Sequence, residues 1–157
     1  CSGLKALDLT PLARLTSVGS WFLYLCRGLR ALDLTRLPKV GSWFLHHCVR
    51  LTVLDLTPLA HVTSIGHSFL DGCTGLTSLD LAPLARLPSV GNMFLCGCVR
   101  STVLDLTPLV CLNGVGHSFL HGCTGLTSLD LTPLAHVAEV GSLFFGGCSG
   151  LTSLVVE

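Results

Sequence analysis

Residues 65–81 read IGHSFLDGCTGLTSLDL, and this pattern returns along the whole chain of 157 residues. Its cysteine, Cys73, has counterparts at equal intervals before and after it, at Cys48 and Cys98. Phe69 and the leucines of the stretch keep the same register. A fixed period of this length is the signature of a protein built from stacked structural repeats. We therefore expect one repeated unit, rather than a globular interior, to decide the fold.

Residues at equivalent positions of successive repeats form columns. The cysteine column contains Cys1, Cys26, Cys48, Cys73, Cys98, Cys123 and Cys148. The interval from Cys26 to Cys48 is shorter than the others, because the second repeat lacks the stretch that reads Pro11-Leu12-Ala13 in the first. A tolerated deletion marks this position as a surface turn. We predict a single array over residues 1–157, with about six 25-residue repeats and the second shortened to 22, and interpret it as a fragment of a longer array.

The composition excludes several classes of protein. Half of the residues are hydrophobic and only 11% are charged, whereas a disordered chain needs low hydrophobicity and high net charge. Nine basic residues balance nine acidic ones, which argues against a nucleic-acid-binding protein. The longest uncharged stretch, residues 106–129, is interrupted by proline and glycines, so no membrane-spanning segment is predicted.

Each repeat contains signals for short local elements. Residues 4–10 alternate inward leucine with outward polar residues, as a half-buried strand does. Thr10-Pro11 then predicts a turn, with Thr as N-cap and Pro at the first helical position. Residues 16–18 form a possible second strand, and Ser20 is a candidate cap for a helical turn over residues 21–23. Strands that recur once in every repeat must run parallel, so the chain is predicted to be a solenoid.

The spacing L-x-x-L-x-L, as in Leu76-x-x-Leu79-x-Leu81, identifies a leucine-rich repeat. The whole unit, including Phe69 and Cys73, resembles the BspA-like class of these repeats. The fold that follows is an α/β-type leucine-rich-repeat solenoid, β-dominated, with a parallel sheet on one face and short strands or helical turns on the other. The resemblance implies a cell-surface or secreted protein that adheres to other proteins; the residues themselves leave the localisation open.

A column of acids is the strongest functional feature. One aspartate per repeat occupies the outward central position of the predicted strand, namely Asp8, Asp33, Asp55, Asp80, Asp105 and Asp130. A line of like charges costs stability, so two interpretations arise, which are compatible. In one, threonine hydroxyls or turn amides hydrogen-bond the carboxylates. In the other, the line contacts a ligand, either a basic protein segment or cations such as Ca²⁺, together with Thr57 and Thr107.

Aromatic residues supply a second candidate contact. Trp21 and Trp43 share one column in adjacent repeats, with Tyr24, His46 and His47 nearby in the sequence. Paired tryptophans are typical of binding hot spots, and packing against a loop or a neighbouring molecule is the alternative. Both tryptophans are retained as candidate ligand-binding residues.

The cysteines and histidines predict neither a metal site nor a cofactor. The cysteine column favours buried free thiols, because parallel Cβ directions disfavour disulfides and zinc needs ligands that close a tetrahedron. His117 and His121 would share one face of a helical turn, but no third ligand is evident. The sequence therefore predicts no metal-binding residue.

Two further expectations concern particular positions. Residues 1–50 carry a net charge of +5 and residues 51–157 one of −5, so head-to-tail self-association is a possible mode of assembly. Ser101 replaces an inward leucine of its column. We expect a soft spot or a small pocket there, because a lost leucine leaves unfilled space.

These observations favour a non-catalytic, protein-binding scaffold of the adhesion type. Catalysis needs unlike residues that converge on one point, whereas near-identical repeats present the same residue in every unit. The ligand is expected on the strand face with its Asp and Thr residues. The alternative is a structural spacer or a self-assembling segment of a larger repeat protein.

Overall fold

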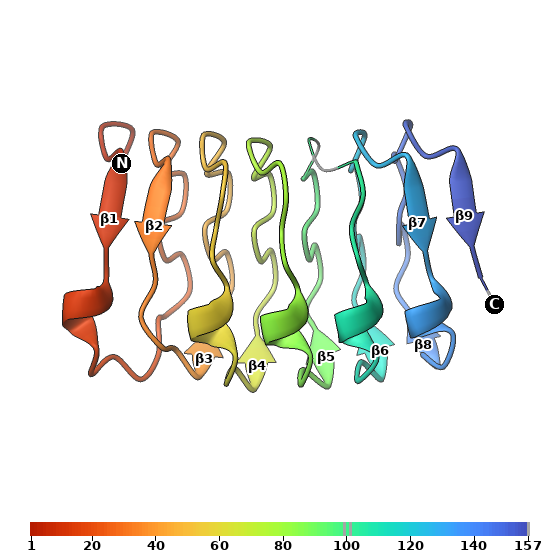
Figure 1. Cartoon of the computed structure of the whole chain (residues 1–157), viewed down its shortest axis with the longest axis horizontal. Coiled ribbons are helices and arrows are strands. Elements are labelled where there is room, and N and C mark those ends of the chain that lie inside the picture. The colour runs from red at the N-terminus through yellow and green to blue at the C-terminus, as the bar shows by residue number, and fades with distance from the viewer. Residues whose placement is uncertain (99, 101, 157) are drawn as a thin grey trace.

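The chain winds into a row of stacked coils, one coil per repeat (Figure 1). The structure is a computed structural model and describes residues 1–98, 100 and 102–156. The two termini lie at opposite ends of the row. Short strands occupy two sides of the coils. On one side, the strand face, lie β1 (Ala6–Asp8), β2 (Ala31–Asp33), β7 (Ser128–Asp130) and β9 (Ser153–Val155). On the other lie β3 (Lys39–Val40), β4 (Ser64–Ile65), β5 (Ser89–Val90), β6 (Gly114–Val115) and β8 (Glu139–Val140).

All strand pairs are parallel and keep the register of the repeat. On the strand face, Asp8 pairs with Asp33 in the ladder of β1 and β2. On the opposite side, Lys39 of β3 pairs with Ser64 of β4, and β5, β6 and β8 form a three-stranded sheet. Parallel pairing between neighbouring coils confirms the predicted leucine-rich-repeat solenoid.

A 3-10 turn follows the strand position in most repeats. These turns are η1 (Thr10–Leu12), η2 (Thr57–Leu59), η3 (Ala82–Leu84), η4 (Thr107–Leu109) and η5 (Thr132–Leu134). Each has Pro near its start, where the fixed φ of proline favours a helical turn. The predicted Thr N-cap is wrong, because a leucine occupies the cap position without a side-chain hydrogen bond. The shortened second repeat has no such turn over residues 34–38.

The helical turn predicted over residues 21–23 is also wrong. Trp21, Leu23 and Leu25 have positive φ values of 68°, 54° and 54°. Because every second residue is in this left-handed region, the segment cannot form a right-handed helix. Backbone groups of this segment bond the adjacent coil instead: the Trp21 amide donates to the Ser42 carbonyl at 2.8 Å. We call residues 21–25 and their equivalents the turn segment. Left-handed conformations cost about 1–2 kcal/mol per residue, which the inter-coil bonds and core packing offset.

The core is a narrow column of apolar side chains along the axis. Its centre is a stack of phenylalanine rings, whose neighbouring centroids lie between 4.9 and 5.7 Å apart. The members are Phe22, Phe44, Phe69, Phe94, Phe119 and Phe144. Leucines of the strand and turn positions belong to the same buried cluster. The interior is therefore one continuous strip in which each coil buries its apolar residues against the next.

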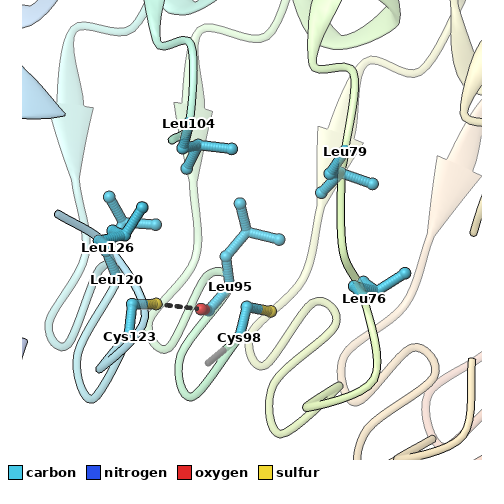
Figure 2. A pocket seen from close by; sticks show the side chains of 8 residues that line it. All are labelled: Leu76, Leu79, Leu95, Cys98, Leu104, Leu120, Cys123 and Leu126. Atoms are coloured by element: carbon cyan, nitrogen blue, oxygen red, sulfur yellow. Dashed lines mark hydrogen bonds between the residues drawn. The ribbon is translucent and has the colours of Figure 1, made fainter. Parts of the chain in front are cut away.

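The predicted soft spot at Ser101 lies outside the described residues. A cavity of about 20 Å³ lies between the flanking repeats (Figure 2). Its lining includes Leu76 and Leu126, the members of the same column one repeat before and one repeat after position 101, together with Leu104, Cys98 and others. The cavity is apolar and far too small for a ligand.

Candidate functional site

The predicted acidic column lies on the strand face, one residue per coil, and we call it the aspartate line. All six side chains, Asp8, Asp33, Asp55, Asp80, Asp105 and Asp130, are exposed. In five of them Oδ1 accepts a hydrogen bond at 2.8 Å from the amide two positions ahead, at the start of the 3-10 turn. Asp33, which precedes the missing turn of the second repeat, has no such bond in the part of the chain that the structure describes. Each of the five therefore holds the beginning of a turn in place, as the structural interpretation predicts.

Threonine hydroxyls strengthen this arrangement. The Thr10 hydroxyl donates to Asp8 Oδ1 at 2.6 Å. This hydroxyl, with the amide of the same residue, lowers the pKa of Asp8 below its usual value. Thr57 and Thr107 lower the pKa of Asp55 and Asp105 in the same way, and Thr132 does so for Asp130. These carboxylates are consequently ionised at neutral pH.

Exposed apolar side chains flank the aspartate line. Val53 and Val103 are each 65% exposed and stand two positions before Asp55 and Asp105. A shallow hollow of about 320 Å³ lies near the C-terminal end of the face, where its lining includes Asp105, Thr107 and Asp130. The strand face thus combines fixed negative charge with apolar surface. The Asp and Thr residues lie together there, and their contact with a ligand stays a prediction.

The two tryptophans stack on each other in the turn segment. Their ring centroids lie 4.3 Å apart with an interplanar angle of 6°, and Trp21 is 53% exposed. Tyr24 packs edge-on against Trp21 at 4.9 Å and stacks on His46 at 4.9 Å. The structure therefore joins Trp21, Trp43, Tyr24 and His46 in one aromatic patch. This patch is built on the turn segments, separately from the strands that carry the aspartate line.

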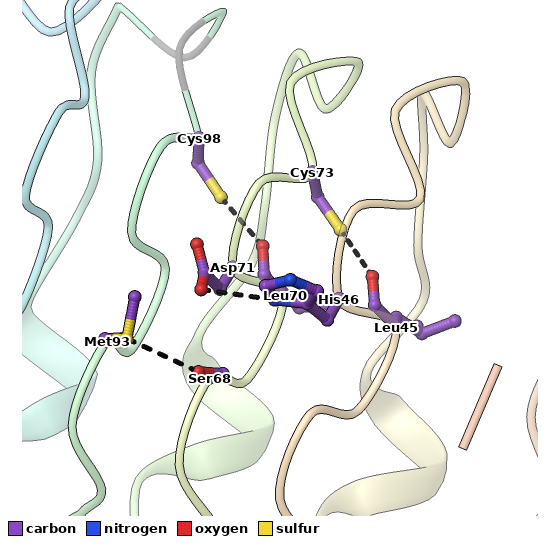
Figure 3. Close-up of polar contacts among 8 residues, drawn as sticks. All are labelled: Leu45, His46, Ser68, Leu70, Asp71, Cys73, Met93 and Cys98. Atoms are coloured by element: carbon purple, nitrogen blue, oxygen red, sulfur yellow. Dashed lines mark hydrogen bonds and ion pairs between the residues drawn. The ribbon is translucent and has the colours of Figure 1, made fainter. Parts of the chain in front are cut away.

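The cysteine column consists of free thiols, and five of them donate a hydrogen bond to a carbonyl of the neighbouring coil. Cys73 Sγ donates to the Leu45 carbonyl at 3.1 Å and Cys98 Sγ to the Leu70 carbonyl at 3.4 Å (Figure 3). Burial raises the pKa of Cys48 to about 12 and likewise that of Cys73 above the usual range. Thiols held protonated in this way are poor nucleophiles. The prediction of buried free thiols is confirmed for five column members, Cys26, Cys48, Cys73, Cys98 and Cys123, whereas Cys148 is half-buried and Cys1 is exposed.

A cluster that the sequence interpretation missed lies beside the aromatic patch. His46 Nδ1 is 3.2 Å from Asp71 Oδ2, and Figure 3 shows the two side chains directed toward each other. One nitrogen of His47 completes a group of three ligand atoms that all lie within 4.8 Å of one another. Burial lowers the pKa of His46, and the nearby carboxylate acts against this shift. The signal was available, because the register of the repeat places His46 and Asp71 in one column.

No helix in the described part of the chain is long and apolar enough to cross a membrane.

Comparison with known proteins identifies the repeat. A family model described as the BspA type leucine rich repeat region matches residues 1–107 and 45–157. No curated protein matches the sequence.

Solved structures share the fold at low identity. A leucine-rich repeat protein of T. pallidum is 22% identical with a TM-score of 0.51, over 89% of this chain and 51% of that protein. A leucine-rich cell surface protein of Faecalibacterium prausnitzii is 17% identical with a TM-score of 0.57, and the match covers 89% of this chain and 42% of that protein. A leucine-rich repeat protein of Bacteroides ovatus is 15% identical with a TM-score of 0.54, and the match covers 98% of this chain and 55% of that protein.

The chain spans about half the length of these structures. The likeness to them concerns the fold alone, whereas the family model covers the chain from its first residue to its last. The chain belongs to the BspA-type leucine-rich repeat family.

Proposed function

We propose that the chain is a non-catalytic scaffold that binds a basic protein segment on its strand face. The observation that carries this proposal is the aspartate line, which presents one exposed carboxylate per coil at a regular spacing. Neighbouring parallel strands lie about 4.8 Å apart, so the line forms a narrow acidic stripe along the solenoid. Extended faces of repeat proteins commonly serve as binding surfaces.

The chemistry of the stripe favours a cationic partner. Lysine and arginine side chains would relieve the mutual repulsion of neighbouring carboxylates, and the lowered pKa values keep at least four of these groups charged. Val53 and Val103, exposed beside the stripe, would contact the apolar stems of such side chains. Within residues 1–98, 100 and 102–156, none of the six carboxylates has a Lys or Arg ion-pair partner.

The same regularity supports a non-catalytic role. An active site brings together unlike groups with unlike environments, whereas the strand face repeats one aspartate and one turn in nearly every coil. One structural relative is a cell surface protein, which accords with a role in contacts between proteins. Trp21 and Trp43 stay a separate prediction, as a second contact on the turn segments.

The test uses a fluorescently labelled oligolysine peptide and three neighbouring substitutions, Asp55→Asn, Asp80→Asn and Asp105→Asn. Asparagine keeps a side-chain oxygen that accepts the turn amide, so charge is removed while the turn is preserved. We expect binding of the peptide, measured by fluorescence anisotropy at low salt, to weaken roughly tenfold in the triple variant. Added salt should weaken binding to the wild-type chain.

The matched control compares two single substitutions. Asp80→Asn removes one charge from the strand face, and Glu139→Gln removes one exposed charge from β8 on the other side. Only Asp80→Asn should reduce peptide binding. Equal losses in the two variants would show that net charge alone attracts the peptide, and unchanged binding in the triple variant would refute the proposed face.

A further inference from the structure

In four successive coils, one column of the turn segment holds a residue whose side chain is able to bind a metal ion. These residues are His46, Asp71, Cys96 and His121. The next column holds glycine in the last four repeats, at Gly72, Gly97, Gly122 and Gly147, but histidine at His47 in the second. Because coils stack about 4.8 Å apart, side chains of one column are brought next to each other. Imidazole, carboxylate and thiol groups therefore meet at the junction of the second, third and fourth repeats.

The geometry of three of these groups suits a single ion. His46 Nδ1 and Asp71 Oδ2 are 3.2 Å apart. Two ligands of a tetrahedral zinc ion, each about 2.1 Å from the metal, are about 3.4 Å apart. The third ligand atom, from His47, lies within 4.8 Å of both. The His47 ring occupies space that the absence of a side chain at Gly72 leaves open.

Buried polar atoms of this cluster lack hydrogen bonds. Asp71 is only 4% exposed. Its Oδ2 forms an ion pair with His46 Nδ1 at 3.2 Å. These two atoms and His47 Nδ1 are buried without a hydrogen bond in the described part of the chain. Buried polar atoms in native proteins almost always have a partner, and a buried carboxylate requires a compensating cation. Three buried groups without a hydrogen bond, whose ligand atoms lie within 4.8 Å of one another, indicate a missing ligand.

We infer that His46, His47 and Asp71 bind a zinc ion, with Cys96 as the fourth ligand. Two imidazoles, one carboxylate and one thiolate form a four-coordinate set of the kind that zinc takes from proteins. The two anionic ligands neutralise the charge of the ion, which suits a buried position.

The position of Cys96 supports its assignment as the fourth ligand. Cys96 is 9% exposed and interacts with the Asp71 carboxylate. Zinc binding would displace the thiol proton to solvent and leave a thiolate on the ion. The thiols of the cysteine column differ, since they donate to backbone carbonyls.

The test starts from a chain with Cys1→Ser and Cys111→Ser, because these two exposed cysteines would bind zinc on their own. The chain is reduced, stripped of metal with a chelator and titrated with Zn²⁺ in a calorimeter. We expect one ion per chain. His47→Gly and Asp71→Asn should each weaken Zn²⁺ binding by at least about tenfold, whereas His61→Asn, at an exposed histidine, should leave it unchanged.

His47→Gly separates loss of binding from loss of fold. Glycine is the residue of the four following repeats at this column, and His47 itself has a positive φ of 55°, which glycine adopts without strain. The metal-free variant should therefore melt at the wild-type temperature or above it. Binding within twofold of wild type in both His47→Gly and Asp71→Asn, or no stoichiometric binding at all, would overturn the site.

Cobalt tests the fourth ligand. Co²⁺ in place of Zn²⁺ should give visible bands of a tetrahedral complex and a sulfur-to-cobalt charge-transfer band in the near ultraviolet. Cys96→Ser should abolish the charge-transfer band. A band that persists in this variant, or that is absent from the parent chain, would overturn the assignment of Cys96.

Discussion

At the residue scale, most aspartates of the line order a turn and still remain exposed, so the two interpretations drawn from the sequence are compatible. Asp55 Oδ1 accepts the Thr57 amide at 2.8 Å, so the carboxylate orders the turn that follows the strand position. The same group is exposed and ionised, so it remains available to a partner. Asp80 makes the equivalent bond to Ala82 at 2.8 Å, which shows that the amide suffices where the hydroxyl is missing.

The lowered pKa values predict a pH dependence of stability. A carboxylate with a folded-state pKa below its unfolded value stabilises the fold above the unfolded pKa, about 3.9, and this contribution is lost as pH falls through the folded pKa. We expect the free energy of unfolding, from urea titrations, to fall over this acid range. Replacement of Asp8, Asp55, Asp105 and Asp130 by Asn should flatten the dependence. If the free energy of unfolding of this variant depended on pH as steeply as that of the wild-type chain, the proposed role of the four carboxylates would be wrong.

At the element scale, the missing turn of the second repeat leaves an apolar side chain uncovered. Leu12 of η1 is 51% exposed, whereas its column counterparts Leu59, Leu84, Leu109 and Leu134 are at most 8% exposed. In the later repeats each 3-10 turn packs on the next. The turn η1 has no such neighbour, because residues 34–38 follow a shorter path.

Insertion of Pro-Leu-Ala between Thr35 and Arg36 should restore the turn and cover Leu12. The expected gain in the free energy of unfolding is about 2 kcal/mol, from burial of Leu12 and of the inserted leucine, and so short an insertion costs little loop entropy. Urea unfolding measures the gain. Insertion of Pro-Asn-Ala is the control and should not stabilise the chain. Equal stability of the two insertions would show that no turn had docked on η1.

At the scale of the whole molecule, each coil is stabilised by its neighbours. Phe94 is fully buried between Phe69 and Phe119, with ring centroids 5.5 Å away on both sides. Phe22 contacts a ring on one side only, at 5.7 Å, and is partly exposed. Stability in such an array is the sum of coil terms and nearest-neighbour terms.

Substitution at the two positions should therefore have unequal effects. Phe94→Ala should destabilise the chain by about 3–5 kcal/mol and broaden the urea transition, because it weakens the contact between the two halves of the array. Phe22→Ala should cost less than about 2 kcal/mol, since the end coil has one neighbour. Urea titrations followed by circular dichroism give both values. A larger loss for Phe22→Ala would contradict the nearest-neighbour description.

The sequence by itself determined the repeat, its parallel strands and the family. A fixed repeat length constrains every coil to the same path, so columns such as that of Cys73 and Phe69 predict which side chains are buried. It also placed the aspartate line on the strand face, because alternation along residues 4–10 separates inward leucine from outward Asp8. The buried columns and the position of the aspartate line both follow from the spacing of residues along the chain, which a single sequence contains.

Other features were decided by the tertiary structure alone. Residues 21–23 do not form the predicted helical turn, because their backbone bonds the adjacent coil, as the Trp21 amide does with the Ser42 carbonyl. Local sequence propensity cannot predict a bond between two coils. The side chains of His46, His47 and Asp71 form a cluster only because the coils stack and bring neighbouring repeats together. Spacing along the chain determines which residues share a column, but the distance between side chains and the partners of their polar atoms depend on how the coils pack.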